Sequence, residues 1–255
     1  MNISRILAIV LLCATMTLAI HPVRAVTSVT VQNDSSWLSE SGNLWIFCEV
    51  TNTGDTWLQY VKVVATLRDA SNAMVDVIYG FTEVQYVPPS VTVPLAMTEL
   101  DTAKSARVAS YTLASEFMEA SPIQQKLVIS NLATSTNTLG DLEILGEVQN
   151  QGTASSPYVK IAGAFYDAAG KLVYVGYTFT DPSEIPAGAT YAFKLTVYSA
   201  DRSGKIDHYN LIAESQIAGY TSVPEFPWPM IIAVAALTVA IVALHRKQPT
   251  MSRRT

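Results

Sequence analysis

Two stretches of the sequence, GNLWIFCEVTNTG at residues 42–54 and GDLEILGEVQNQG at residues 140–152, decide the fold class. They align without a gap at a constant offset of 98 residues. The same offset runs back to Asn33 over Asn131 and forward to Glu116 over Glu214, and 25 of the 84 positions in this range are identical. Self-similarity at a fixed period is the signature of a repeated unit. The middle of the chain is therefore predicted to be two copies of one domain.

Each copy shows the alternation that is typical of β-strands. In the first copy, apolar residues of one parity are Leu44, Ile46, Cys48 and Val50, then Val61, Val63, Ala65 and Leu67. The second copy keeps this parity, and Lys62 and Lys160 fall on the outward parity. Turn residues follow at 52–54 and 150–152. Period-two alternation with turn signals predicts a small antiparallel β-sandwich for each copy.

The second copy resembles a known family. Its pattern G-x-L-x-I-x-G-E-V-x-N-x-G, then Y-V-K-I and F-Y-D-A-A-G-K-L-V, is similar to the FxLYD domain, an immunoglobulin-like β-sandwich of bacterial and archaeal exported proteins. The residues that carry the resemblance are Gly140, Leu142, Ile144, Gly146, Glu147, Val148, Asn150, Gly152, Val159, Ile161, Phe165, Tyr166 and Asp167. The first copy departs from it at Cys48 and at Leu67-Arg68. The resemblance implies a fold and an exported location, but no reaction.

The N-terminus has the layout of a secretory signal peptide. Residues 1–25 contain Arg5, an apolar run from Ile6 to Ile20, and a small residue, Ala25, at the expected cleavage point. A membrane-spanning anchor is the alternative. Because the 15 apolar residues would rise only about 22 Å as a helix, short of a hydrocarbon core of about 30 Å, cleavage is the prediction.

The C-terminus has an apolar run of a different kind. No charge lies between Met230 and Leu244, and Trp228 stands where an interfacial ring would lie. Residues 230–244 are therefore predicted to form one transmembrane helix. The basic residues after it are Arg246, Lys247, Arg253 and Arg254. By the positive-inside bias they place the tail in the cytoplasm and residues 26 to 222 outside the cell membrane.

A short motif precedes this helix. Pro224, Glu225 and Phe226, followed by the helix and the basic end, resemble the PEF-type C-terminal sorting signal of archaeal surface proteins. The resemblance implies processing by an archaeosortase, a membrane transpeptidase that transfers the protein to another anchor. A retained single-pass anchor is the alternative. The predicted segments are a signal peptide (1–25), domain 1 (26–116), a linker (117–126), domain 2 (127–214), a neck (215–229), the helix (230–244) and the tail (245–255).

The residues offer little chemistry. Outside the two termini His208 is the only histidine and Cys48 the only cysteine, so no catalytic triad, disulfide or histidine-based metal site can be built. Cys48 is interpreted as a buried small hydrophobe. A cation site from Asp181, Glu184, Asp201 and Asp207 is the weaker alternative, because the first copy has Ala103 and Ala109 in place of Asp201 and Asp207. Residues 26–222 carry 20 acidic against 10 basic residues, which argues against a nucleic-acid partner. No catalytic residue, cofactor or metal is predicted.

Three tryptophans are the candidate contact patch. Trp37, Trp45 and Trp57 lie in the first copy, where the second has Ser135, Glu143 and Ser155. Because a core position would not accept a carboxylate cheaply, the indoles are predicted to lie at the surface, ready for a glycan or a protein partner. Packing at the junction of the two domains, or flat on their own sheet, is the alternative, and it is favoured over the contact patch.

Asn33-Asp34-Ser35 is in addition a sequon for N-glycosylation at Asn33. The sequence as a whole predicts an all-β, exported, membrane-anchored cell-surface protein of two tandem immunoglobulin-like sandwiches, with a structural or adhesion-like interaction role and no catalysis. The alternative is an extracytoplasmic ligand- or metal-binding accessory subunit of a membrane complex.

Overall fold

The computed structural model describes residues 28–216, which all fall in one compact unit. Apart from two one-turn helices, the regular structure of these residues is antiparallel β-strand, which confirms the predicted all-β class. No helix within the described range is long and apolar enough to cross a membrane. The predicted signal peptide, the sorting motif at Pro224, Glu225 and Phe226, the helix at 230–244 and the basic tail lie outside the described residues.

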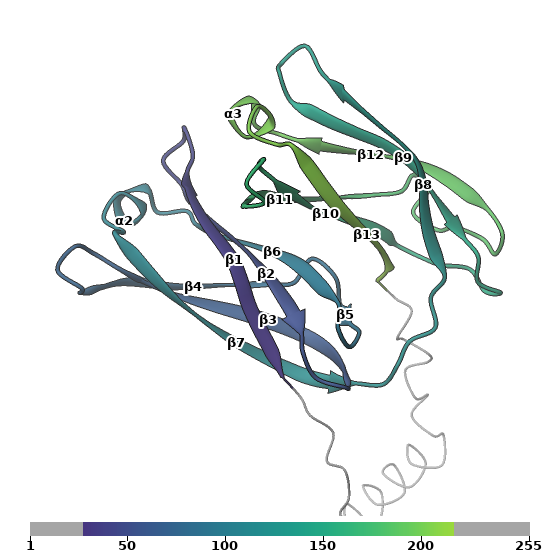
Figure 1. Cartoon of the computed structure of the whole chain (residues 1–255), viewed down its shortest axis with the longest axis horizontal. Helices are drawn as coiled ribbons and strands as arrows, with labels where there is room; N and C mark the ends of the chain where they lie inside the picture. Colours follow the sequence, from purple (N-terminus) through teal and green to yellow (C-terminus); the bar gives the residue numbers. More distant parts are fainter. Residues whose placement is uncertain (1–27, 217–255) are drawn as a thin grey trace, which may run out of the picture. The chain divides into compact units, whose positions relative to one another are not determined.

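The first repeat, residues 28–120, forms two sheets (Figure 1). One has the order β1-β2-β6, from strands β1 (Val29–Leu38), β2 (Leu44–Asn52) and β6 (Thr92–Glu99). The other has the order β4-β3-β5 with β7 also on β3, from strands β3 (Trp57–Arg68), β4 (Met74–Phe81), β5 (Tyr86–Val87) and β7 (Ser110–Ala120). Helix α2 (Thr102–Ser105) connects β6 to β7. Strand β7 continues to Ala120, into the range predicted as linker.

The second repeat, residues 126–216, has the same pairings at the same offset. Its sheets have the orders β12-β9-β8 and β11-β10-β13. The strands are β8 (Leu127–Thr136), β9 (Leu142–Asn150), β10 (Val159–Tyr166), β11 (Leu172–Phe179), β12 (Thr190–Val197) and β13 (His208–Ser215), with helix α3 (Ala200–Ser203) before β13. Where β5 lies in the first repeat, Ser156 and Ile185 form only an isolated bridge. The sequence repeat is therefore also a repeat of strand pairing.

The inward parity of the strands forms a separate core in each repeat. Ile46, Cys48 and Val63 are fully buried in the first, and Ile144 and Ile161 are fully buried in the second. This confirms the parity predicted from the alternation. Burial also raises the pKa of the Cys48 thiol to about 12, so this cysteine is an inert apolar side chain, as predicted.

A β-bulge interrupts the first strand of each repeat at an equivalent place. The register shifts between Gln32 and Ser35 in β1, and the matching shift in β8 comes 98 residues later. Asn33 and Asn131 lie in these bulges with φ of 50° and 52°, in the left-handed region that asparagine tolerates better than most residues. A bulge re-aims side chains away from the regular alternation. Here it turns the Asn33 side chain toward the other repeat.

Candidate functional site

The outer face of sheet β1-β2-β6 packs on the outer face of sheet β11-β10-β13, and we call this contact the inter-repeat junction. Its apolar centre is a buried cluster of Phe47, Ala164, Tyr166, Leu172 and Val175. Trp37, Trp45, Ala96 and Tyr174 pack against that cluster from the sides. The Phe47 and Tyr174 ring centroids are 5.8 Å apart in a tilted arrangement that aromatic pairs favour. The junction is therefore packed like a hydrophobic core.

Glu49 lies in this buried contact with both carboxylate oxygens satisfied. The Tyr166 hydroxyl donates to Oε1 at 2.5 Å, and Asn33 Nδ2 donates to Oε2 at 2.9 Å. Burial, followed by the hydrogen bond to Glu49, raises the pKa of the Tyr166 hydroxyl. Tyr166 therefore remains a donor, and the carboxylate is bound from both repeats.

The Asn33 amide binds the β10–β11 hairpin. Its Nδ2 donates to the Gly170 carbonyl at 3.2 Å and its Oδ1 accepts from the Leu172 amide at 3.2 Å. Next to it, the Ser35 hydroxyl donates to the Leu172 carbonyl at 2.5 Å. Nδ2 is the atom to which an N-linked glycan would be bonded. A glycan on Asn33 and these junction contacts therefore compete for the same nitrogen.

A second carboxylate joins the repeats near the end of β13. Glu214 accepts from the backbone amides of Gln85 and Tyr86 at 2.6 and 2.8 Å. Burial raises its pKa from 4.5 to about 7, although the two amide donors act in the opposite direction. The matching residue of the first repeat, Glu116, is largely exposed and pairs with Lys62 at 2.6 Å.

Lys160 is covered at the same junction. It points away from its own core, as predicted for both Lys62 and Lys160, but it pairs with Glu83 of the first repeat at 2.6 Å. Its ammonium also lies 4.0 Å from the centroid of the Tyr177 ring. Both members of the Lys160–Glu83 pair are largely buried, so the pair is shielded from solvent.

A groove of about 580 Å³ opens beside the apolar cluster, and we call it the junction groove. Its aromatic lining is Trp37, Trp45, Tyr174, Tyr177 and Tyr198, and its polar lining includes Ser39, Ser41, Asn43, Glu83 and Thr196. Trp37 and Trp45 are direct cross-strand partners on β1 and β2. The Arg202 guanidinium of helix α3 lies 4.5 Å from the Trp37 ring centroid. The structure thus places two of the three predicted tryptophans in one groove, each half-buried.

Trp57 is not part of this groove. It lies in β3 and lines a smaller cavity of about 270 Å³ with Tyr86, Pro88 and Glu214. The three indoles therefore form two separate surfaces. One sequence signal marks the covered face of β2, because Trp45 to Cys48 is a run of four apolar residues in an alternating strand. A strand that is apolar on both parities is covered on both faces. The run therefore indicates that the outward face of β2, where Phe47 lies, packs on another surface.

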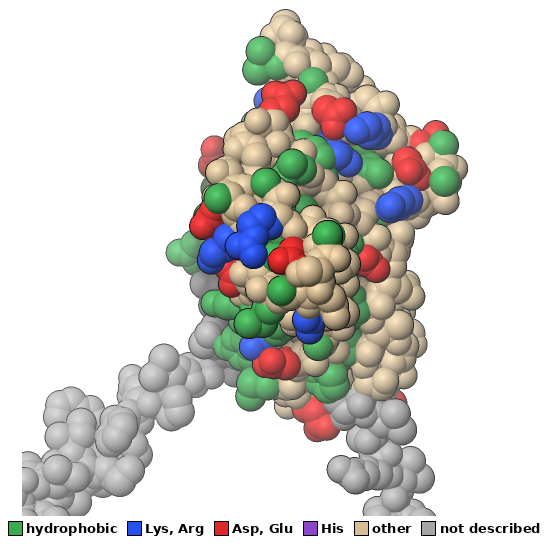
Figure 2. Space-filling model, turned by 90° about the vertical axis from the view of Figure 1, so that its left-hand side faces the viewer, with side chains coloured by type: hydrophobic (Ala, Val, Ile, Leu, Met, Phe, Trp, Pro, Cys, Tyr) green, Lys and Arg blue, Asp and Glu red, His purple; other side chains and the backbone are tan. Residues whose placement is uncertain are grey.

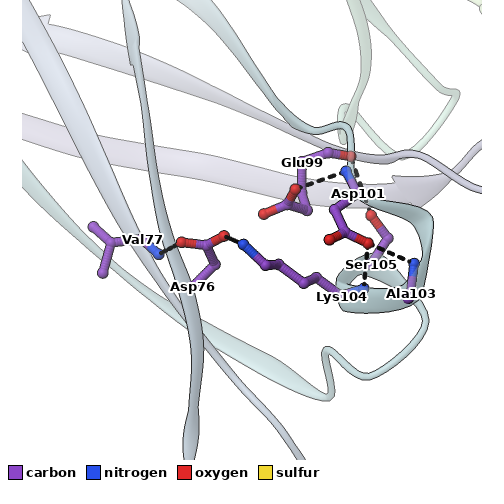
Figure 3. A network of polar contacts seen from close by, with 7 residues as sticks. All are labelled: Asp76, Val77, Glu99, Asp101, Ala103, Lys104 and Ser105. Carbon is purple, nitrogen blue, oxygen red and sulfur yellow. Dashed lines mark hydrogen bonds and ion pairs between the residues drawn. The ribbon is translucent and has the colours of Figure 1, made fainter.

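A polar network at helix α2 has a structural role in the first repeat (Figure 3). Asp101 caps the helix by accepting from the amides of Ala103 and Lys104 at 2.9 and 3.2 Å. Lys104 then reaches β4 and binds Asp76 at 2.5 Å, and this bond is the main cause of the lowered Asp76 pKa. Arg202 occupies the position of Lys104 in the second repeat, and it contacts Trp37 across the junction instead.

The remaining titratable groups form no metal-binding cluster within residues 28–216. Within this range no three His, Cys, Asp or Glu side chains gather where they could hold a metal ion. Of the acidic residues considered in the second repeat, Asp201 pairs with Lys205 at 2.9 Å and Asp207 with His208 at 3.2 Å. In Figure 2, Lys and Arg lie among Asp and Glu on the visible face and form no single charged patch.

No protein-family model matches the chain. No curated protein matches it. Two structures of the exo-chitosanase CsxA of Amycolatopsis orientalis, both variants in complex with PNP-beta-D-glucosamine, are similar to part of it. The first has 10% identity and a TM-score of 0.26, over 67% of this chain and 24% of that one. The second has 11% identity and a TM-score of 0.24, over 65% and 25%. This chain thus spans about a quarter of the solved chains, and a likeness at this TM-score carries no argument.

Proposed function

We propose that this protein is an exported, membrane-anchored cell-surface protein of two tandem immunoglobulin-like β-sandwiches, with a structural and interaction role and no catalysis. The observation that carries the proposal is the inter-repeat junction, where Phe47 and Leu172 are buried as in a domain core. Two sandwiches joined in this way form a stiff unit rather than two domains on a flexible linker. Stiffness suits a protein that presents a binding surface at a cell envelope.

Two observations support the division into two sandwiches. Each repeat has its own pair of sheets with the same strand order, and each has its own buried core. The resemblance of residues 140–167 to the FxLYD domain points to the same immunoglobulin-like architecture. In this proposal residues 26–222 lie outside the cell and the helix at 230–244 holds them to the membrane.

The anchor has two alternative fates. With the PEF-type motif at Pro224, Glu225 and Phe226, an archaeosortase would remove the C-terminal helix and transfer the protein to another anchor. Without processing, the helix would remain as a single-pass anchor with its basic end in the cytoplasm.

Membrane fractionation with intact-mass measurement tests this proposal. A surface-exposed, membrane-associated protein that lacks residues 1–25 is the expected result, and protease added to whole cells should digest the sandwiches. Loss of everything after about residue 224 would support archaeosortase processing, and a mass for residues 26–255 would support a retained anchor. A protein found in the soluble cytoplasmic fraction with Met1 intact would overturn the proposal.

The junction groove favours a second candidate function. A groove of about 580 Å³ lies in the size range of small-ligand sites, which is about 300–1,000 Å³. An extracytoplasmic accessory subunit that delivers a ligand to a membrane partner would use such a groove. Co-purification of the full chain with a membrane complex, lost when the groove residue Trp45 is replaced by alanine, would favour this function over a purely structural one.

A further inference from the structure

We infer that the junction groove binds a short neutral oligosaccharide, with its pyranose rings stacked on Trp37 and Trp45. The inference deepens the interaction role proposed above and rests on it. It starts from the aromatic side chains of the groove, because a sugar ring presents flat patches of C–H groups that pack well on large aromatic faces.

The two indoles are arranged for such stacking. Trp37 and Trp45 stand directly opposite each other on neighbouring antiparallel strands, so their rings lie on one face of the sheet. Both are half-buried. The Arg202 guanidinium lies over one face of the Trp37 ring, 4.5 Å from its centroid, and fixes its orientation by a cation–π contact, so a sugar would stack on the opposite face. On the other repeat, Tyr198 is 80% exposed and extends the aromatic lining toward solvent.

Neutral polar groups of the groove complement the hydroxyls of a sugar. Ser39, Ser41 and Asn43 lie in the β1–β2 turn and line the groove beside Trp37. The turn is ordered by hydrogen bonds between its own side chains, at 2.9 Å between the Ser39 and Ser41 hydroxyls and 3.3 Å from Asn43 Nδ2 to Ser41. A hydroxyl both donates and accepts, as sugar hydroxyls do, so the turn offers bonds in both directions.

The charges near the groove favour a neutral ligand. Glu83 is the one Asp or Glu of the lining, and Lys160 neutralises it at 2.6 Å. Arg202 lies at the edge with Asp201 3.5 Å from its Nε. The net charge of −10 over residues 26–222, from 20 acidic and 10 basic residues, would repel an anionic sugar. A short neutral saccharide is not repelled by this net negative charge and needs no counter-ion in the groove.

Within residues 28–216 the second repeat lacks the two tryptophans that define this groove. At the positions of Trp37 and Trp45 it has Ser135 and Glu143, and Glu143 pairs with Lys194 at 3.1 Å. The inference therefore predicts one saccharide site per chain. This stoichiometry separates a built site from weak association with many exposed tyrosines.

Isothermal titration calorimetry on the full chain tests the inference. The detergent must have no sugar head group, since a maltoside or glucoside would compete. The probes are the neutral tetrasaccharides cellotetraose, mannotetraose and N-acetylchitotetraose, with tetragalacturonate as the charged probe. At least one neutral probe should bind at one site per chain, and tetragalacturonate should bind more weakly by tenfold or more.

Variants assign the site. Trp45→Ala and Trp37→Ala should each weaken binding at least tenfold, whereas Trp57→Ala, outside the groove, should leave it within twofold. Ser41→Ala, at the exposed turn, offers a milder change that should weaken binding twofold to fivefold without a loss of folding. Thermal unfolding of each variant identifies any that fail to fold.

The inference is overturned if none of the neutral probes binds, if Trp57→Ala weakens binding as much as Trp45→Ala, or if tetragalacturonate binds best. It is also overturned if cross-linking on cells shows a protein seated on Trp45 and no saccharide binds. Surface location is measured independently by fractionation and mass. A surface-exposed chain that binds no saccharide would contradict this inference and leave the proposed function standing.

Discussion

The outer faces of sheets β1-β2-β6 and β12-β9-β8 come from equivalent strands, yet one is covered and the other is open. Both keep the same local hydrogen bond, from Asn33 to Glu49 at 2.9 Å and from Asn131 to Glu147 at 2.6 Å. At the centre of each face, however, Phe47 is 1% exposed and its counterpart Leu145 is 41% exposed. The backbone is repeated, but the side chains on this face pack against the other repeat in one case and face solvent in the other.

The difference lies in a few substitutions. Trp45 and Ala96 of the covered face correspond to Glu143 and Lys194 of the open face, which form an ion pair at 3.1 Å. The junction joins two different faces, that of β1-β2-β6 in the first repeat and that of β11-β10-β13 in the second. A contact between unlike faces can be repeated by further copies of the unit and build an open-ended array. A charged pair in place of an indole opposes such growth, because docking would desolvate both charges. The ion pair therefore disfavours a second contact of this kind on the open face.

Loss of Phe47 should have the largest effect. Phe47→Ala removes a fully buried ring from the junction and should lower the free energy of unfolding by about 3–5 kcal/mol. Leu145→Ala, the same position on the open face, should change it by no more than about 0.5 kcal/mol. Urea unfolding of both variants measures the contrast. Equal losses would mean that the junction contributes no more than an exposed face.

A matched pair on the other side of the junction comes next. Leu172 is fully buried and its counterpart Met74 is 64% exposed. Leu172→Ala should cost about 3 kcal/mol and Met74→Ala less than about 0.5 kcal/mol. Chemical denaturation monitored by tryptophan fluorescence reports both. A large effect of Met74→Ala would instead show that something covers the β4 face in solution.

The free energy of unfolding should depend on pH through the protonation of Glu214. Its pKa is about 7 in the folded chain against 4.5 unfolded, so between these values the folded state holds a proton that the unfolded state has released. Stability should therefore fall as pH rises from 4.5 to 7, by at most about 3 kcal/mol. In Glu214→Gln this fall should be absent, and Glu116→Gln, its exposed counterpart, should follow the wild type. Urea midpoints at several pH values measure it, and an unchanged fall in Glu214→Gln would exclude this carboxyl as its source.

Removing one hydroxyl should have the smallest effect. Tyr166→Phe deletes the hydrogen bond to Glu49 and should cost about 1–2 kcal/mol, because it leaves a buried carboxylate oxygen without that donor. Tyr177→Phe, at a half-exposed position on the next strand, serves as the control and should be neutral. Thermal unfolding distinguishes them. Equal stability of the two variants would mean that water replaces the Tyr166 hydroxyl at no cost.

The sequence predicts the interior of each repeat better than the contact between them. Alternation along a strand assigns Ile46, Val63 and Ile161 to a core because a strand has only two faces. It does not say what lies over the outward face. Lys160 has outward parity and its side chain is nevertheless largely buried, since the surface that covers it comes from residues far away in the chain.

The candidate site shows the same limit. All three tryptophans are replaced in the second repeat, so these replacements alone do not show that Trp37 and Trp45 lie together and Trp57 apart. Separating Trp57 from them required the pairing of β1 with β2, and the far wall of the groove required the docking of Tyr174 and Tyr198. Neither the FxLYD resemblance nor the PEF-type motif carries information on that wall.

The bulge at Asn33 also sets an order in time. Its partners Gly170 and Leu172 lie 137 and 139 residues further along the chain. In a chain that emerges N-terminus first at about 5–20 residues per second, the amide waits roughly 7–27 seconds for them. In the exported chain proposed above, a glycosylating enzyme would reach Nδ2 during that interval and would meet a closed junction afterwards. The sequence separation between Asn33 and its partners would thus set how long the sequon stays accessible to modification.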